Sequence, residues 1–337
     1  MKTIKLCDSS IYFELPQKLE FEGSVLLISD TNVAPLFLDL IAQKINAPQI
    51  HTLVLASGES QKCLKTLEQI LNVAFSCKLD RQSTMIALGG GVISDLVGLA
   101  SGIFMRGIDF VNIPTTLLAQ VDASVGGKCG INTQEGKNLI GLFHSPKSVY
   151  ISPMFLETLA PREWNAGMAE VIKIATCLDE RLFDTLFEKQ QIKQNPLEVI
   201  HSSIKLKADI VRQDPFEKDK RAVLNYGHTF GHIIEKENNY TRYLHGEAVS
   251  LGMILANQLA QRLLGFAHSA EVRSLLSLYD LPTHYTITNP QQFLEALFLD
   301  KKTKNHQINF ILPTQIGSYQ QVSPSQEEIL TFLSEQY

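Results

Sequence analysis

The chain has 337 residues, 45% of them hydrophobic and 19% charged, and its formal net charge is −5 at pH 7. This length and apolar content predict a large core divided between two domains. The small negative charge argues against a protein that binds nucleic acid or an anionic membrane surface. The five cysteines form no CxxC pair, which argues against a disulfide framework and a zinc ribbon. The N-terminal MKTIKLCDSS lacks an apolar signal segment, and no run approaches the roughly 20 apolar residues of a membrane span, so we expect a cytoplasmic protein.

The first half of the chain alternates short β-rich runs with amphipathic helical ones. Buried strands are predicted over residues 23–30, 51–57, 84–91 and 109–116. Helices are predicted between them, over residues 34–44, 62–75 and 92–103. This alternation is typical of a doubly wound parallel sheet, so we expect a Rossmann-like α/β domain over residues 1–158 that binds a dinucleotide.

Helical patterning dominates from about Pro153 onward, apart from the apolar stretch INFILP near Ile308. We therefore expect a mostly α-helical second domain over residues 159–337. One of its helices is predicted from Leu224 to Glu235.

The loop LGGGVISD places three glycines between a predicted strand and a predicted helix. Bare backbone N–H groups and the helix dipole can hold a pyrophosphate at such a position. The residues predicted to contact it are Gly90, Gly91, Val92, Ser94 and Asp95. The loop lacks the GxGxxG pattern, and a plain tight turn would also explain its glycines.

Acid, amide and hydroxyl groups stand at the ends of the other predicted strands. They are Asp30, Asn32, Glu59, Thr115 and Thr116. A ribose or an adenine edge lies at such strand ends in a dinucleotide-binding fold. Each residue is also a common turn or cap residue, so the prediction depends on their occurrence together.

Three histidines and one glutamate predict a metal site. His228 and His232 are four residues apart in the predicted helix, so both rings can face one side. No Glu follows the first His as in zincins, and such a pair alone is more often packing or surface. His245 adds a third imidazole, and Glu170 stands in an apolar helical run where an unpaired charge would be too costly. We predict an open site with Glu170, His228 and His245 as ligands.

Cationic residues beside glycines and amides form another predicted group. Each lysine alone could be an ordinary surface charge. Together they predict an anion site that contains Arg106, Lys128, Lys137, Asn138, Lys173, Lys207, Arg221, Lys301 and Lys302. Asp122, six residues before Lys128, is a candidate partner or proton carrier.

These motifs resemble those of the 3-dehydroquinate synthases, within the sugar phosphate cyclase family. The matching segments are SDTNV, GGGVISDLVG, FMRGIDFVNIPTTLLAQVDASVGGK, GKN, AEVIK, RAVLNYGHTFGH, LHGEAVSLGM and DKK, which together extend over nearly the whole chain. Ser94 departs from the pattern, since a glycine is usual there, and Gln134 and Glu135 stand before the retained GKN.

The resemblance implies NAD and one zinc or cobalt ion as cofactors. It implies conversion of 3-deoxy-D-arabino-heptulosonate 7-phosphate into 3-dehydroquinate and phosphate, by transient oxidation, phosphate elimination, re-reduction and intramolecular aldol closure. The substrate would be oriented by Arg106, Lys128, Lys137, Asn138, Lys173, Lys207, Arg221, Asn225, His232 and Lys301, with Asp122 nearby. Further NAD contacts are predicted for Lys62, Lys128, Lys137, Phe155 and Thr158, and we expect a homodimer.

Three other functions share some of these features. A metal-dependent polyol or glycerol-phosphate dehydrogenase would have a similar layout but would release NADH, and it would not need so many anion-binding cations. Another sugar phosphate cyclase would differ mainly at substrate contacts. A regulatory nucleotide-binding protein would be expected to have lost the metal ligands, all of which are present.

Overall fold

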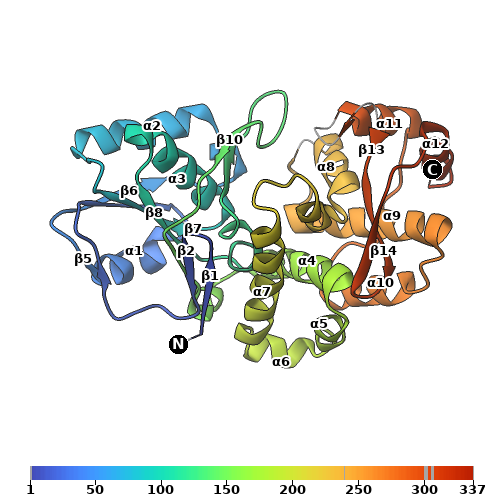
Figure 1. The fold of residues 1–337 in the computed structure, drawn as a ribbon, viewed down its shortest axis with the longest axis horizontal. Coiled ribbons are helices and arrows are strands. Elements are labelled where there is room, and N and C mark those ends of the chain that lie inside the picture. The colour runs from blue at the N-terminus through green and yellow to red at the C-terminus, as the bar shows by residue number, and fades with distance from the viewer. Residues whose placement is uncertain (1, 239, 300–302, 305–306, 337) are drawn as a thin grey trace. The chain divides into compact units, whose positions relative to one another are not determined.

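The computed structural model describes residues 2–238, 240–299, 303–304 and 307–336, and the chain divides into two compact units, Met1–Ala160 and Pro161–Tyr337 (Figure 1). The strands of the first unit are β1 (Thr3–Leu6), β2 (Ser9–Tyr12), β3 (Leu19–Glu20), β4 (Val25–Asp30), β5 (Ile45–Asn46), β6 (Ile50–Leu55), β7 (Thr84–Gly89), β8 (Asp109–Pro114), β9 (Lys128–Ile131), β10 (Ile140–Phe143) and β11 (Ser148–Tyr150). Its helices are α1 (Ala34–Ala42), α2 (Leu64–Ser76) and α3 (Gly91–Ile103). Short helical turns are η1 (Glu59–Gln61), η2 (Phe104–Arg106), η3 (Ala119–Ala123) and η4 (Pro153–Leu156).

Seven strands of the first unit form one sheet in the order β1-β2-β11-β8-β7-β4-β6. Among these described pairs, β1 with β2 is antiparallel and the others are parallel. The predicted Rossmann-like parallel sheet is thus confirmed, and the four predicted strands correspond to β4, β6, β7 and β8. The N-terminal hairpin, β11 and the β9–β10 hairpin were not predicted, because these strands have only three or four residues and carry little periodic signal.

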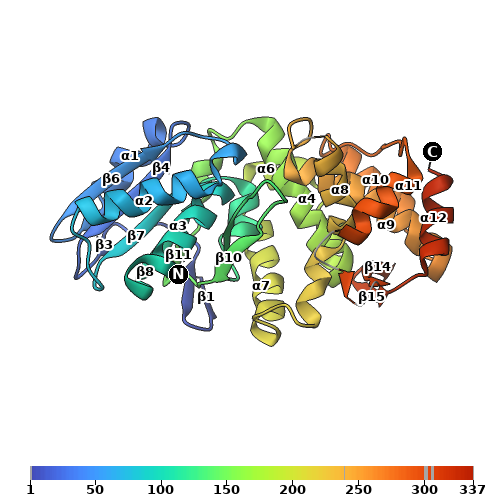
Figure 2. The ribbon, with the colours of Figure 1, turned by 90° about the horizontal axis from the view of Figure 1, so that it is seen from above.

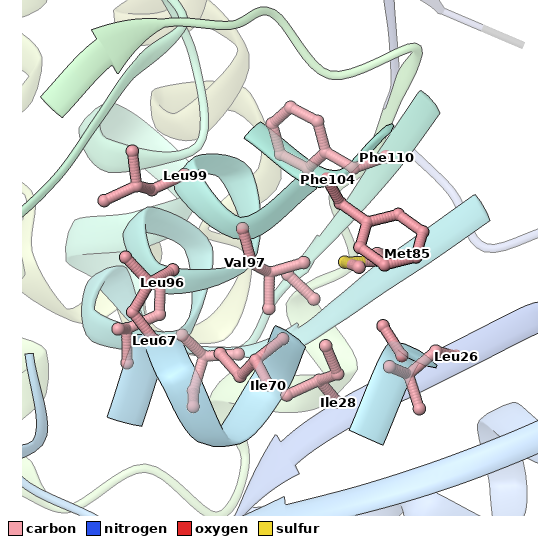
Figure 3. Packing of buried hydrophobic residues seen from close by; sticks show 14 of the residues in the cluster. Leu26, Ile28, Leu67, Ile70, Met85, Leu96, Val97, Leu99, Phe104 and Phe110 are labelled. Carbon is pink, nitrogen blue, oxygen red and sulfur yellow. The ribbon is translucent and has the colours of Figure 1, made fainter. Parts of the chain in front are cut away.

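Apolar side chains on both faces of this sheet are buried, which explains why its central strands read as continuous hydrophobic runs. Leu26 and Ile28 of β4 pack with α2 and α3 in one cluster (Figure 3). Their neighbour Leu27 points the other way and packs with Phe37 and Ile41 of α1. Because side chains alternate along a strand, this single six-residue strand supplies both layers of the core.

The second unit is mostly helical, as predicted. Its helices are α4 (Pro161–Leu178), α5 (Glu180–Thr185), α6 (Lys189–Gln194), α7 (Leu197–Gln213), α8 (His228–Glu237), α9 (His245–Leu264), α10 (Ser269–Leu278), α11 (Pro290–Leu299) and α12 (Gln326–Ser334), with the 3-10 turn η5 (Lys220–Asn225). Its strands are β12 (Thr303–Lys304), β13 (Gln307–Ile308), β14 (Phe310–Gln315) and β15 (Ser318–Val322). The apolar INFILP stretch therefore lies in β13 and β14, and β14 pairs with β15 (Figure 2). No helix in the described part of the chain is long and apolar enough to cross a membrane.

A helix was predicted from Leu224 to Glu235, and the prediction of its first residue was wrong. The chain forms the η5 turn up to Asn225, and Gly227 has a left-handed backbone with φ of 77°. The α-helix begins only at His228. Because glycine adopts this conformation without the steric cost of a Cβ atom, it allows the chain to turn directly before the first histidine.

Candidate active site

Glu170, His228 and His245 lie together in the second unit. Glu170 is fully buried in the middle of α4, while His228 and His245 are the first residues of α8 and α9. The Nε2 atoms of His228 and His245 lie 3.6 Å and 3.4 Å from Glu170 Oε1. One potential ligand atom from each residue falls within 4.8 Å of the other two. The structure thus brings together the three residues predicted as ligands.

Glycines allow the three helices that carry these residues to approach closely. A Cβ atom on Gly246, the neighbour of His245, would lie only 1.9 Å from the carbonyl oxygen of Ala166 in α4. A Cβ atom on Gly252 would lie 1.9 Å from the Gly227 carbonyl oxygen at the start of α8. Both contacts are with backbone that cannot rotate away, so α9 packs against α4 and α8 at distances that only glycine permits (Figure 1).

The surroundings of the three residues suit a divalent ion. Lys173 Nζ lies 2.5 Å from Glu170 Oε2, and this pair is almost entirely buried. Burial would lower the pKa of His245, but the nearby Glu235 and Glu170 carboxylates raise it to about 10. The two carboxylates thus attract positive charge to this place, and a metal ion that binds there would displace the proton of the imidazole. Two imidazoles and one carboxylate oxygen, with positions left open for other ligands, fit zinc or cobalt.

The His232 ring lies close to the ring of each histidine of this group. Its centroid is 5.4 Å from that of His228 and 6.2 Å from that of His245. It falls one turn after His228 on α8, as the i,i+4 spacing predicted. Its predicted role in orienting a hydroxyl group is compatible with this position.

Buried cations distinguish this unit from an ordinary charged surface. Lys173, Lys207 and Arg221 have exposed fractions of 2%, 4% and 2%. They come from α4, α7 and η5, three elements that pack on one another. Lysine and arginine are almost never this buried without specific partners, so the surface-charge interpretation fails for these three.

Asp214 organises the loop before η5. Its carboxylate accepts hydrogen bonds from the backbone N–H groups of Lys218, Asp219 and Arg221, at 2.8–3.0 Å. The Lys218 amide, together with the other two, holds the pKa of the Asp214 carboxyl below its usual range. The Asn225 amide, at the end of η5, donates to Glu217 at 2.7 Å.

In the first unit, the predicted nucleotide-binding residues gather at one edge of the sheet. Asp30 is the last residue of β4, and Gly90 and Thr115 directly follow β7 and β8. Because these three strands are adjacent and parallel, the three residues lie on the same side of the sheet. Gly90 is the N-cap of α3, whose first residue is Gly91. Asp30 also accepts hydrogen bonds from the backbone N–H groups of Asn32 and Val33, two and three residues further on, so it stabilises the turn before α1 as well.

Two hydroxyl groups at this edge fit a bound polar ligand. Ser94 Oγ and Thr115 Oγ1 are buried and have no hydrogen-bond partner among the described residues. Buried polar atoms are nearly always satisfied, and an exception calls for a water, an ion or a ligand group. The free end of α3 beside them favours an anion such as the pyrophosphate of NAD.

A polar network connects this edge to the loop between β9 and β10. Lys62 is 6% exposed and forms a short ion pair with Asp95, and it donates to Asn138 Oδ1 at 2.5 Å. Burial lowers the pKa of Lys62, but Asp95 and Glu59 outweigh it and raise the pKa. Asn132 donates to Glu59 at 2.8 Å and accepts from the Asn138 backbone N–H at 3.0 Å. Residues predicted to bind the cofactor and the substrate thus share hydrogen bonds.

The remaining predicted residues of the first unit are more scattered. Lys128 is exposed at the start of β9, Asp122 lies in the π-helical turn η3, and Arg106 is exposed with φ of 70°. The ring of Phe155 is buried against Phe37, with centroids 4.9 Å apart. Val92 lies at the start of α3, and Thr116 lies beside Gly90. Lys137 is 3.9 Å from Glu59, and Thr158 is exposed. Lys301 and Lys302 lie outside the described residues.

Comparison with known protein families decides the relationship. The model of the 3-dehydroquinate synthase N-terminal domain matches residues 52–166, and that of the C-terminal domain matches residues 167–303. The chain belongs to the 3-dehydroquinate synthase family. The predicted family resemblance is confirmed.

Relatives in this family match along most of their length. The 3-dehydroquinate synthase of Helicobacter pylori is 52% identical over 326 residues, which cover 96% of this chain and 94% of the relative. That of a Sulfurovum species is 49% identical over 319 residues, or 94% of this chain and 91% of the relative.

Two solved structures of cyclases share the fold. The 2-epi-5-epi-valiolone synthase of Streptomyces hygroscopicus, with NAD+ and Zn2+ bound, is 27% identical with a TM-score of 0.86, over 94% of this chain and 91% of that one. A 2-deoxy-scyllo-inosose synthase complexed with carbaglucose-6-phosphate, NAD+ and Co2+ also has a TM-score of 0.86, over 99% of this chain and 100% of that one. Because it is only 24% identical, this likeness informs on the fold alone.

Two polar residues of this 3-dehydroquinate synthase family member were not predicted from the sequence, one beside the proposed metal ligands and one in the polar network of the first unit. Glu235 contacts His245, and its position seven residues after His228 on the same helix could have indicated it. Asn132 connects Glu59 with Asn138, and only its presence in the loop that carries GKN pointed to it.

Proposed function

We propose that the chain is an NAD- and metal-dependent 3-dehydroquinate synthase of the shikimate pathway, in the biosynthesis of chorismate and aromatic amino acids. It converts 3-deoxy-D-arabino-heptulosonate 7-phosphate into 3-dehydroquinate and inorganic phosphate. The observation that carries this proposal is 52% identity over 96% of the chain to a curated 3-dehydroquinate synthase. In this proposal, residues 1–158 bind NAD, and residues 159–337 bind the metal and much of the substrate.

The cofactors supply the redox and Lewis-acid chemistry. When bound, NAD accepts a hydride and later returns it, and the zinc or cobalt ion lowers the pKa of the substrate hydroxyl that is oxidised. Glu170, His228 and His245 hold the metal. The residues that hold NAD are Asp30, Asn32, Glu59, Lys62, Gly90, Gly91, Val92, Ser94, Asp95, Thr115, Thr116, Lys128, Lys137, Phe155 and Thr158.

The protein's own contribution to the reaction is mainly orientation. Lys173, Lys207 and Arg221 are buried cations that can bind the phosphate and carboxylate of the substrate with little competition from water. Asn225 and His232 orient hydroxyl groups. In the first unit, Arg106, Lys128, Lys137 and Asn138 contribute further donors, with Asp122 near them in sequence, and Lys301 is assigned the same role. The leaving phosphate can itself take up a proton, so a dedicated base is not required.

We further propose that the enzyme works in the cytoplasm as a homodimer. The location is the ordinary one for an enzyme of small-molecule biosynthesis that needs NAD. The dimer can be tested by light scattering of the purified protein, where a single monomer mass across the micromolar range would contradict it.

One steady-state assay tests the proposed function. With catalytic amounts of NAD, the heptulosonate phosphate should yield phosphate and 3-dehydroquinate in equal amounts without net NADH. NADH accumulation without phosphate release would instead indicate a polyol or glycerol-phosphate dehydrogenase. Phosphate release only from glucose 6-phosphate or another sugar phosphate would indicate a different cyclase.

Lys128→Ala refines the same assay. Loss of one charged donor to the substrate should cost about 1.5–3 kcal/mol of transition-state stabilisation, with a much smaller effect on NAD affinity. Lys147→Ala is the matched control, because Lys147 is 66% exposed and pairs only loosely with Asp109 at 3.7 Å. Equal effects of the two substitutions on turnover would contradict the role of Lys128.

A further inference from the structure

Glu235 is a buried carboxylate next to the proposed metal ligands but outside the ligand set. Its side chain is only 2% exposed. It lies on α8 seven residues after His228, which is almost two helical turns, so both residues occupy the same face of the helix. This face is turned toward the start of α9, where His245 stands.

The two ring nitrogens of His245 face two different carboxylates. Nε2 lies 3.4 Å from Glu170 Oε1, on the side of the proposed metal. Nδ1 lies 3.4 Å from Glu235 Oε2. An imidazole that donates its Nδ1 proton to a carboxylate keeps the lone pair of Nε2 available for a metal, and it becomes a stronger ligand.

His228 is oriented in a similar way by a weaker acceptor. Its Nδ1 lies 3.3 Å from the backbone carbonyl oxygen of Tyr226, and its Nε2 faces Glu170. Both proposed histidine ligands therefore have Nδ1 beside an oxygen and Nε2 directed at the same carboxylate. They differ because His228 has a neutral acceptor and His245 a charged one.

The charges around the proposed metal site favour a second carboxylate there, which Glu235 supplies. The negative charge of Glu170 is compensated in part by Lys173, 2.5 Å away. A divalent ion held by Glu170 and two neutral imidazoles would then leave excess positive charge in a largely buried place. Glu235 adds a second buried negative charge within contact of a ligand.

We propose that Glu235 is a positioning residue for the metal, which holds His245 with Nε2 toward the ion and strengthens metal binding. This inference rests on the proposed metal site of Glu170, His228 and His245. A purely structural role is the competing explanation, since a carboxylate near the first residue of α9 also interacts favourably with the dipole of that helix. The two explanations differ in whether removal of Glu235 changes metal affinity or only stability.

The test compares zinc affinity, measured by competition with a chelator, and the visible absorption of the cobalt-loaded protein, across four variants. Glu235→Gln keeps the shape but loses the charge, and it should weaken zinc binding about 10-fold. Glu235→Ala should weaken it by up to about 100-fold. Both should shift the cobalt spectrum. Glu237→Gln is the matched control, because Glu237 is exposed on the same helix and accepts from Tyr285 at 2.6 Å, and it should bind metal as the wild type does.

The fourth variant, His245→Ala, separates this inference from the site on which it rests. Full zinc content in His245→Ala would overturn the proposed ligand set and the inference with it. Loss of zinc in His245→Ala, with wild-type affinity and an unchanged cobalt spectrum in both Glu235 variants, would overturn the role of Glu235 alone. If Glu235→Ala does not fold, the nearly isosteric Glu235→Gln decides, and a lower melting temperature with unchanged metal affinity would show that the role is structural.

Discussion

Gly246→Ala should disrupt the proposed metal site without touching a ligand. The new Cβ atom would lie 1.9 Å from the carbonyl oxygen of Ala166 and 2.8 Å from its Cα atom, whereas Cβ atoms essentially never come within 3.0 Å of such atoms. The start of α9 must therefore move away from α4 by about 1 Å or more. His245 is the adjacent residue on α9, and Glu170 lies one turn after Ala166 on α4.

A movement of this size exceeds what a metal site tolerates, because ligand distances are set to within about 0.2 Å. We expect zinc affinity to fall at least as much as when a ligand-orienting group is lost, about 10- to 100-fold, and stability to fall by about 1–3 kcal/mol from overpacking. Elemental analysis and chelator competition measure the first effect, and thermal melting measures the second.

A control separates the two effects. Gly265→Ala, at the other end of α9, adds a Cβ atom at φ of 72° where nothing lies within 4 Å. Its left-handed backbone should lower stability by about 1–2 kcal/mol and leave metal affinity intact. Wild-type zinc affinity in Gly246→Ala would refute the reasoning, as would equal losses of affinity in the two variants.

Three other changes test the remaining sites. Gly91→Val should fold, because the new Cβ atom would meet Ala123 at an ordinary 3.4 Å. The larger side chain should weaken NAD binding, because it crowds the pyrophosphate. Unchanged NAD affinity by calorimetry would contradict the cofactor site. Asn132→Ala removes hydrogen bonds of 2.8 Å and 3.0 Å and should raise both the NAD dissociation constant and the substrate KM by about 5- to 10-fold, near 1 kcal/mol, and no change in either would count against the shared network. The pKa of Asp214 is lower in the folded protein than the value of about 3.9 expected in the unfolded chain. Its carboxylate therefore stabilises the fold at pH values above about 3.9, and this contribution is lost as the pH falls through the pKa of the folded state. The difference in melting temperature between wild type and Asp214→Asn should therefore be largest near pH 6 and shrink as the pH falls below about 3.9, and a constant difference would contradict the assignment.

The sequence alone determined the features that depend on neighbouring residues. The runs that became β4, β6, β7 and β8 are apolar and bounded by turn residues, so their conformation could be predicted from a few positions. The glycine loop before α3 and the spacing of His228 and His232 are also local patterns. Long motifs shared with a family added the cofactor and substrate contacts and the reaction, because such motifs preserve the order of residues that meet only in the fold.

Only the tertiary structure decided which distant residues meet and which charges are buried. Glu170, His228 and His245 converge because glycines let three helices approach, and that approach depends on packing between segments far apart in the chain. The burial of Lys207 reverses the surface-charge interpretation that its residue type would suggest. The spacing of Glu235 from His228 places both residues on one face of α8, but its contact with His245 exists only once α8 packs against α9.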